Sequence, residues 1–183
     1  MIVRRLFTVA NVHKYMPQVF LGLGSNLGDR RTYLREAIRL LREAPCIHKI
    51  RCSSVYESEA HTHDDEEAPP FLNAVVGVET SCSPEELWLI CQRIEAHMGR
   101  RRVRKWAPRT LDIDVLLYDD QVIHTQQLQI PHPRMLERRF VLEPLAELAP
   151  EARIPVGEGI IVQEALARCS DKHAIQKLED SLC

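Results

Sequence analysis

The sequence predicts an α+β fold in which helices pack on an antiparallel sheet. Segments with the alternating apolar pattern of strands and segments with the three-to-four-residue spacing of helices follow one another in the order β-α-β-β-α-β. Each helical segment also begins at a residue type that caps helix N-termini. This order is the ferredoxin-like arrangement, and the residues after it predict C-terminal additions to that core.

The first strand and helix are expected before Pro45. Residues 19–26 (VFLGLGSN) are typical of a strand that runs into a turn. Asp29 can cap the helix that follows. The apolar residues of that helix recur on one face: Leu34, Ala37, Ile38 and Leu41.

Two strands and a second helix should follow. Residues 47–58 alternate and are rich in β-formers, residues 59–70 form an acidic loop, and residues 71–80 predict another strand. Ser83 and Glu86 have the spacing of a capping box, with Pro84 between them at the first helical position. Gly99 is a natural end for this helix.

The last core strand, residues 109–118, follows a basic loop at residues 100–108. A short pairing segment should come next. Helical periodicity then runs through residues 133–150, where Pro150 ends it, and one more helix is expected near residues 161–169.

The composition is that of one folded domain of an ordinary soluble protein. The 183 residues are 45% hydrophobic and carry a net charge of −2, so the chain as a whole does not attract nucleic acid or an anionic membrane. Residues 1–18 read as an N-terminal extension and residues 19–183 as a single domain. No stretch approaches the roughly 20 apolar residues of a membrane span. None of the six cysteines forms a C-x-x-C pair, which argues against a zinc ribbon or a thioredoxin-like site. We expect a cytoplasmic monomer with reduced cysteines, because nothing in the sequence suggests secretion.

The stretch RTLDIDVLLY, at residues 109–118, carries two carboxylates inside an apolar strand. Asp112 and Asp114 should share one face of the sheet, about 6.5 Å apart along the backbone. Their mutual repulsion is tolerable if a cation lies between them, and carboxylate oxygens are ligands that Mg²⁺ prefers. The alternative is a solvent-facing strand whose aspartates simply point outward.

Six Arg or Lys residues lie between Arg100 and Arg109, directly before the aspartate pair. Beside a metal site, this density suits a polyanion such as a nucleoside triphosphate. A solvated basic loop that binds nothing is the plain alternative. An RNA-binding module that uses Trp106 is another, but the strands lack the stacking aromatic residues of such a module, and the aspartates would repel phosphates.

Four blocks of sequence together resemble one family of enzymes. FLGLGSNLGDR, FLNAVV, RRVRKWAPRTLDIDVLLY and PHPRMLERRFVLEPLAELAP are similar, in this order, to the 6-hydroxymethyl-7,8-dihydropterin pyrophosphokinases of folate biosynthesis. The resemblance runs from about residue 19 to about residue 151. It implies a ferredoxin-like fold and transfer of pyrophosphate from ATP to the hydroxymethyl group of the pterin, with AMP as the other product. It also implies two Mg²⁺ ions, with ATP as co-substrate.

The resemblance also implies roles for individual residues. Asp112 and Asp114 would each hold Mg²⁺. The reaction chemistry, rather than the resemblance, suggests that a carboxylate near the hydroxyl, such as Asp114, accepts the substrate proton. Four residues are expected to take part in catalysis: Arg100, Arg102, Arg109 and Asp114. Six are expected to contact the pterin: Ser58, Phe71, Asn73, Trp106, Asp112 and Phe140. Six are expected to contact ATP: Gln92, Glu95, Arg109, Val115, His132 and Arg138.

Plain structural roles remain open for several of these residues. Phe71 and Phe140 would sandwich the flat pterin, or they would be ordinary core residues. Asn73 would read the pterin edge through its amide, or it would cap a local turn. Gln92 and Glu95 would face the nucleotide, or they would form an exposed polar stripe on the helix.

Overall fold

A six-stranded antiparallel sheet organises the chain. The structure is a computed structural model, and it describes residues 15–60, 68–99 and 109–183. Five strands form a continuous path, and β2 pairs separately with β4. The path runs through β10 (Ile175–Ser181), β3 (Ser54–Ser58), β4 (Phe71–Thr80), β1 (Gln18–Ser25) and β5 (Asp112–Tyr118), and β2 is Ile47–Cys52.

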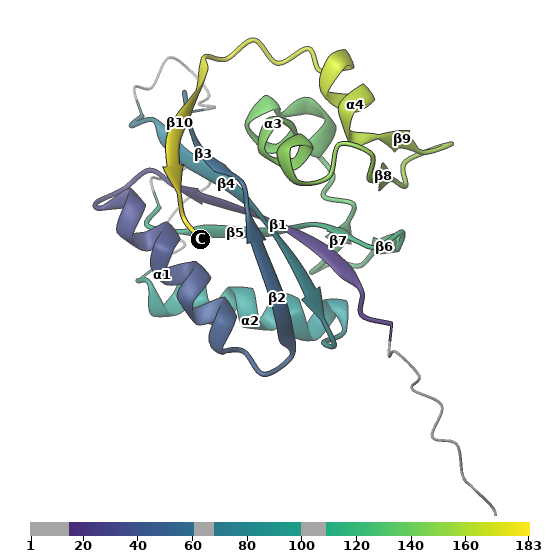
Figure 1. The fold of residues 1–183 in the computed structure, drawn as a ribbon, viewed down its shortest axis with the longest axis horizontal. Coiled ribbons are helices and arrows are strands. Elements are labelled where there is room, and N and C mark those ends of the chain that lie inside the picture. Colours follow the sequence, from purple (N-terminus) through teal and green to yellow (C-terminus); the bar gives the residue numbers. More distant parts are fainter. Residues whose placement is uncertain (1–14, 61–67, 100–108) are drawn as a thin grey trace, which may run out of the picture.

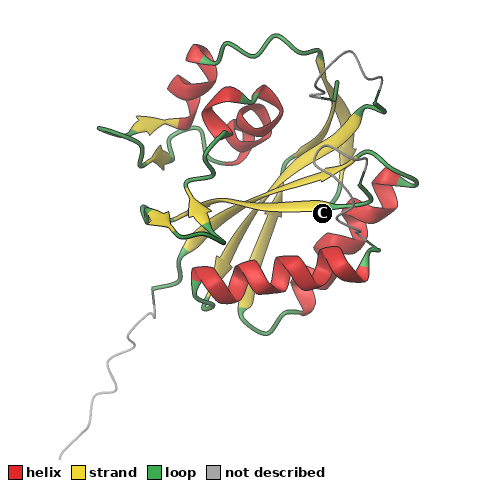
Figure 2. Cartoon of the chain, turned by 180° about the vertical axis from the view of Figure 1, so that it is seen from behind, coloured by secondary structure: helices red, strands yellow, loops and turns green. Residues whose placement is uncertain are grey.

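Helices cover both faces of this sheet (Figures 1 and 2). On one face, α1 (Arg30–Glu43) and α2 (Pro84–His97) enclose the larger apolar core. On the other, α3 (Arg139–Leu148) and α4 (Val162–Arg168) enclose a smaller core. The predicted mixture of helices and an antiparallel sheet is confirmed, and the two helices of the predicted core, α1 and α2, lie on the same face. The C-terminal additions occupy the second face, which the core order alone leaves open.

Local signals placed the first two helices correctly. Asp29 accepts a hydrogen bond from the Thr32 backbone N–H, which caps α1. Ser83 and Glu86 form both hydrogen bonds of a capping box at the start of α2. Gly99 follows α2 with a φ of 75°, a conformation that glycine adopts without a steric cost.

The segment predicted as one strand at residues 47–58 is two strands. Ser53 interrupts it, and its hydroxyl accepts a hydrogen bond from the Val75 backbone N–H. The two parts therefore pair with different halves of β4: β2 with residues 76–80 and β3 with residues 71–73. The other edge of β3 pairs with β10.

The C-terminal part contains the short elements that complete the fold. The helix expected in residues 133–150 begins later, at Arg139, after a 3-10 turn at Met135–Glu137, and the helix expected near residues 161–169 is confirmed as α4. Two small hairpins join these elements. They are β6 (Ile123–His124) with β7 (Gln129–Ile130), and β8 (Arg153–Ile154) with β9 (Ile160–Ile161).

Four of the six cysteines form disulfides. Cys46 bonds to Cys82 and Cys52 bonds to Cys183, while Cys91 and Cys169 are free thiols. The expectation of reduced cysteines is wrong for these four. Strand pairing explains the first bond, because the register that places residue 47 opposite residue 80 brings the flanking cysteines together. Within the described part of the chain, no helix is both long enough and apolar enough to cross a membrane.

Glu147 links helix α3 to two strands of the sheet, β3 and β10. Its carboxylate accepts hydrogen bonds from the backbone N–H and the hydroxyl of Ser54, at 2.8 and 2.9 Å, and pairs with Lys177 of β10. Partial burial by itself raises the pKa of Glu147, but the hydrogen bonds from Lys177 and Ser54 outweigh it and leave this pKa below its usual 4.5. The ionised carboxylate therefore stabilises the attachment of α3 to β3 and β10.

We expect Glu147→Gln to lower the free energy of unfolding by about 1 kcal/mol at neutral pH. The contribution of Glu147 is complete above pH 4.5, and it is lost as the pH falls through the lowered folded-state pKa. Urea unfolding of both proteins across this range should therefore show the difference shrinking toward acid pH. The matched control is Glu164→Gln, which removes an exposed pair with Arg168 and should cost under about 0.5 kcal/mol. A difference that does not vary with pH would contradict the role given to the carboxylate.

Candidate active site

The two aspartates of β5 lie on the sheet face that α3 and α4 only partly cover. Residues directly opposite each other on neighbouring antiparallel strands have side chains on the same face. Gly24 of β1 lies opposite both Asp112 of β5 and Asn73 of β4, and Gly22 lies opposite Asp114. A row of polar groups therefore crosses three strands, with a glycine at its centre.

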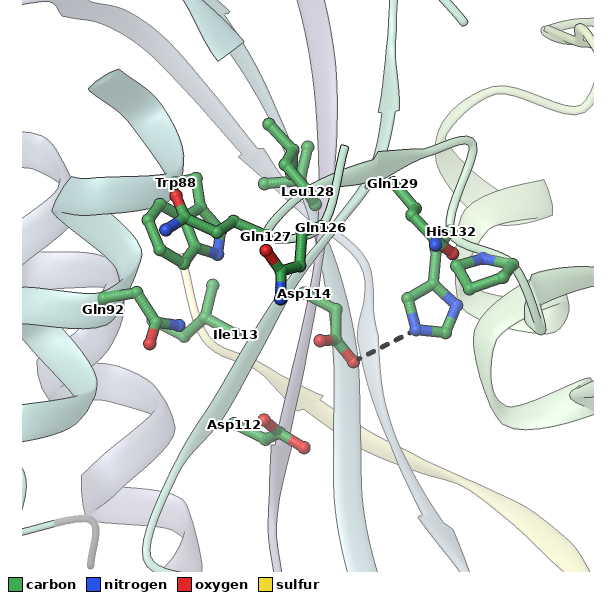
Figure 3. Close-up of a pocket in the computed structure, with 12 residues that line it drawn as sticks. Trp88, Gln92, Asp112, Ile113, Asp114, Gln126, Gln127, Leu128, Gln129 and His132 are labelled. Atoms are coloured by element: carbon green, nitrogen blue, oxygen red, sulfur yellow. Dashed lines mark ion pairs between the residues drawn. The ribbon is translucent and has the colours of Figure 1, made fainter. Parts of the chain in front are cut away.

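A cavity of about 270 Å³ opens beside the carboxylates (Figure 3). It lies between β5, helix α2 and the loop that joins β6 to β7. Trp88 of α2 forms part of one wall and His132 part of the opposite one. The cavity brings together five of the residues predicted from the sequence: Gln92, Asp112, Asp114, Val115 and His132.

Arginines surround the aspartate pair. Arg109 donates to Asp112 at 2.5 Å, with about a quarter of each side chain exposed. Burial, followed by repulsion from Arg134, lowers the pKa of Arg138, while Asp114 and Asp112 act in the opposite direction. Cations held this close to one another favour an anion between them.

His132 contributes a neutral ring. Burial, and then the positive charges of Arg138 and Arg134, lower its pKa to about 4. Its Nε2 lies 3.8 Å from Asp114, which is beyond hydrogen-bond range, and its Nδ1 accepts from the Arg134 backbone N–H at 3.3 Å. The proton is therefore assigned to Nε2, on the side of the aspartate.

Glu95 lies behind the aspartate-bearing strand. It is 2% exposed, and its carboxylate accepts the Ile113 backbone N–H at 2.7 Å and the Gln92 amide at 3.1 Å. The expectation of an exposed polar stripe is wrong for Glu95. Because β5 is an edge strand, this carboxylate satisfies a backbone donor between the two aspartates and fixes their spacing.

The other end of the polar row carries the residues expected to contact the pterin. The Asn73 amide donates to the Ser58 hydroxyl at 2.9 Å, and both residues are buried. Phe71 begins β4 and lies close to Gly24, since a Cβ on that glycine would be 3.6 Å from the ring. Phe140 lies at the start of α3 and packs against the smaller core. The Arg138 guanidinium lies over its ring, 5.4 Å from the ring centre.

The donor set fits Mg²⁺ that arrives with a nucleotide. Asp112 and Asp114 are 22% and 42% exposed at their side chains, so each can reach a ligand. Among the described residues, no group of three or more His, Cys, Asp or Glu side chains forms a metal cage. Mg²⁺ commonly takes one or two carboxylates from the protein and its remaining ligands from water and substrate phosphates.

Comparison with known proteins places the chain in a family. Residues 20–150 match the 7,8-dihydro-6-hydroxymethylpterin-pyrophosphokinase (HPPK) family. The chain belongs to this family. The match covers most of the chain, including every described residue of the polar row and the cavity.

Individual HPPK relatives match most of the chain. The 2-amino-4-hydroxy-6-hydroxymethyldihydropteridine pyrophosphokinase of Bacillus subtilis is 40% identical over 162 residues, which are 88% of this chain and 96% of that protein. The enzyme of the same name from Aquifex aeolicus is 45% identical over 141 residues, or 77% of this chain and 86% of its own.

Solved structures support the fold alone. A crystal structure of Plasmodium falciparum HPPK-DHPS aligns with a TM-score of 0.65 at 16% identity, over 84% of this chain and 43% of that one. A second, also of Plasmodium falciparum HPPK-DHPS, aligns with the same TM-score over 86% and 46%. This HPPK chain therefore spans less than half the length of those proteins.

Three predicted site residues lie outside the part of the chain that the structure describes, and some residues that line the cavity were not predicted. Arg100, Arg102 and Trp106 fall outside the described residues. Trp88 and the glutamines at positions 126, 127 and 129 line the cavity but were not predicted, because nothing in a helix or a loop sequence indicates which strand it faces. Asn26 was also missed, although it stands in the GLGSN block.

Proposed function

We propose that this chain transfers the pyrophosphoryl group of ATP to the hydroxymethyl oxygen of 6-hydroxymethyl-7,8-dihydropterin, releasing AMP. Membership of the HPPK family supports this activity. The observation that carries the proposal is the polar row, since it joins a carboxylate pair suited to a metal–nucleotide complex to a buried amide suited to a pterin edge.

The nucleotide would occupy the cavity beside β5. Arg109 and Arg138 would bind phosphate oxygens, and the neutral His132 would donate through Nε2 to a phosphate or sugar oxygen. Two Mg²⁺ ions held by Asp112 and Asp114 would neutralise phosphate charge and stabilise the charge that develops on the oxygen between the α- and β-phosphorus atoms. Gln92 and Val115 would form the wall nearest the base or ribose.

The pterin would lie at the other end of the row. Asn73, oriented by Ser58, would bind donors and acceptors on the edge of the ring, and Phe71 and Phe140 would stack on its faces. Asp114 would accept the proton of the hydroxymethyl group. These residues would mainly align the hydroxymethyl oxygen with the phosphorus atom that it attacks, because phosphoryl transfer depends on orientation and electrostatics more than on a strong base.

Three further proposals concern the molecule as a whole. The core is a ferredoxin-like topology in which β2 and β3 together take the place of one strand, and the order β4, β1, β5 supports this. The enzyme acts as a monomer in the cytoplasm. Its partners are small molecules rather than nucleic acid or membrane, in line with the net charge of −2.

The direct test is an assay of AMP release from ATP, Mg²⁺ and 6-hydroxymethyl-7,8-dihydropterin. AMP should form only when all three are present, and chelation of the metal should stop it. Absence of AMP with all three present, together with RNA binding that persists without Mg²⁺, would favour the RNA-binding alternative instead.

Asn73→Ala should weaken pterin binding about tenfold or more and change nucleotide binding little, because the amide contacts only the pterin side of the site. Titration calorimetry with 6-hydroxymethylpterin and with a nonhydrolysable ATP analogue plus Mg²⁺ measures the two effects separately. Equal losses for both ligands would contradict this role.

A further inference from the structure

We propose that Asn26 is a positioning residue. From the end of β1, it holds in place both the backbone of Arg109 and the segment that leads into β4, where residues expected to contact the pterin lie. This inference rests on the proposed function. Asn26 directly follows β1 and is 3% exposed, so its amide is buried between the two halves of the site. Asn26 stands in the GLGSN block, but none of the predicted roles included it.

Asn26 holds the backbone of Arg109 at two points. The Asn26 side-chain oxygen accepts the Arg109 backbone N–H at 2.8 Å, and the Asn26 backbone N–H donates to the Arg109 carbonyl at 3.1 Å. A single hydrogen bond would allow the Arg109 peptide to rotate about it. Two bonds, to the donor and the acceptor of the same residue, fix both its position and its orientation.

Arg109 needs this support because it lies outside the strand ladder. The pairing of β5 with β1 begins at Asp112, three residues later. The Arg109 guanidinium reaches Asp112 at 2.5 Å, so any shift of its backbone moves a cation relative to the carboxylate pair. A displacement of about 1 Å in a positioning group can cost on the order of 100-fold in rate.

The Asn26 amide nitrogen extends the attachment to the pterin side. It donates to the Pro69 carbonyl at 3.4 Å, and Arg30 donates to the neighbouring Pro70 carbonyl at 2.7 Å. The chain then enters β4 at Phe71, two residues before Asn73. Asn26 therefore contacts the segments that lead into both predicted binding residues of β4 and the aspartates of β5.

An asparagine suits this place because one side chain must both accept and donate. Aspartate retains the acceptor for the Arg109 N–H, but it loses the donor for the Pro69 carbonyl. Alanine loses both. The two substitutions should therefore separate the nucleotide side from the pterin side, which a purely structural role would not do.

The test measures binding to the full chain by titration calorimetry, so that it does not depend on turnover. Asn26→Ala should weaken a nonhydrolysable ATP analogue with Mg²⁺ about tenfold, and 6-hydroxymethylpterin by a similar factor when the analogue is saturating. Asn26→Asp should keep analogue binding within about threefold of the wild type while still weakening the pterin about tenfold. Equal losses of both ligands in Asn26→Asp would overturn the proposal.

A double-mutant cycle tests whether Asn26 acts through Arg109. In an Arg109→Ala background, Asn26→Ala should weaken the analogue by less than about threefold further, since the side chain that it positions is gone. Additive losses would overturn the proposal. If Asn26→Ala does not fold, the comparison in the cycle is made with Asn26→Leu, which has the same branched arrangement of heavy atoms and no polar side-chain atoms.

Ser53→Ala is the matched structural control. Ser53 is 2% exposed, and its hydroxyl also makes two hydrogen bonds, to the Val75 N–H and the Ser54 carbonyl. This variant should lower the melting temperature without changing either binding constant, and a change in both would overturn the proposal. AMP release by the wild-type protein is measured in parallel, so that failure of the proposed function is recognised separately.

Discussion

Replacing Asp114 with alanine is expected to lower turnover by about 1,000-fold or more, and Asp112→Ala should have an effect of the same order. Each change would remove one of the two proposed metal ligands and leave the phosphate charge poorly neutralised. Neither should unfold the protein, because both side chains lie on a partly exposed face and removing one relieves its repulsion with the other. The melting temperature of Asp114→Ala should therefore stay the same or rise, and that of Asp112→Ala, which also loses the partly exposed ion pair with Arg109, should change little.

Metal binding gives a second measurement of the same variants. Mn²⁺, followed by electron paramagnetic resonance with a nonhydrolysable ATP analogue present, should bind more weakly or with fewer ions per chain after either change. Asp120→Ala, at an exposed acidic residue in the turn after β5, is the control and should leave both turnover and metal binding unchanged. Wild-type turnover by either site variant at saturating Mg²⁺ would refute the assignment of the metal site.

Local chemistry made most of the core predictable. Caps such as Asp29 and Ser83 act within one turn of helix, so their signals can be read without the rest of the chain. Strand β10 could not be predicted this way. Its sequence, IQKLEDS, has only two large apolar residues, and it is a strand because it pairs with the edge of β3 that faces away from β4. Pairing between distant segments depends on such edges rather than on local pattern.

The same distinction between local pattern and the pairing of distant segments decides which parts of the site could be predicted. The alternation of β5 was enough to predict that Asp112 and Asp114 share a face, because side-chain direction in a strand repeats every two residues. Which residues lie beside the two aspartates on that face depends on the register, and the register is set by the pairing of three strands. Glu95 shows the difference, since the resemblance implies only a contact with ATP, whereas its hydrogen bond to the Ile113 backbone depends on how α2 packs against β5.

The strand register places Gly24 at the centre of the polar row. We expect Gly24→Val to weaken pterin binding about 100-fold or more. A Cβ at this position would lie 3.3 Å from the Asn73 amide oxygen and 3.6 Å from the Phe71 ring. The two methyl groups of valine would then occupy the strip between Asn73 and Asp112, where the hydroxymethyl group has to meet the phosphate. Since Gly24 has an ordinary strand conformation, valine adds bulk there without backbone strain.

Gly77→Val separates this steric effect from a general loss of stability. A Cβ on Gly77 would also meet its nearest neighbour, the Phe20 ring, at 3.3 Å, but Gly77 is four residues along β4 from Asn73, about 13 Å away. Both variants should lose some thermal stability, and only Gly24→Val should lose the pterin, measured by calorimetry with the ATP analogue saturating. Pterin binding that survives in Gly24→Val would mean that the substrate does not cross β1 between the amide and the carboxylates. The two halves of the site would then have to be joined by another route.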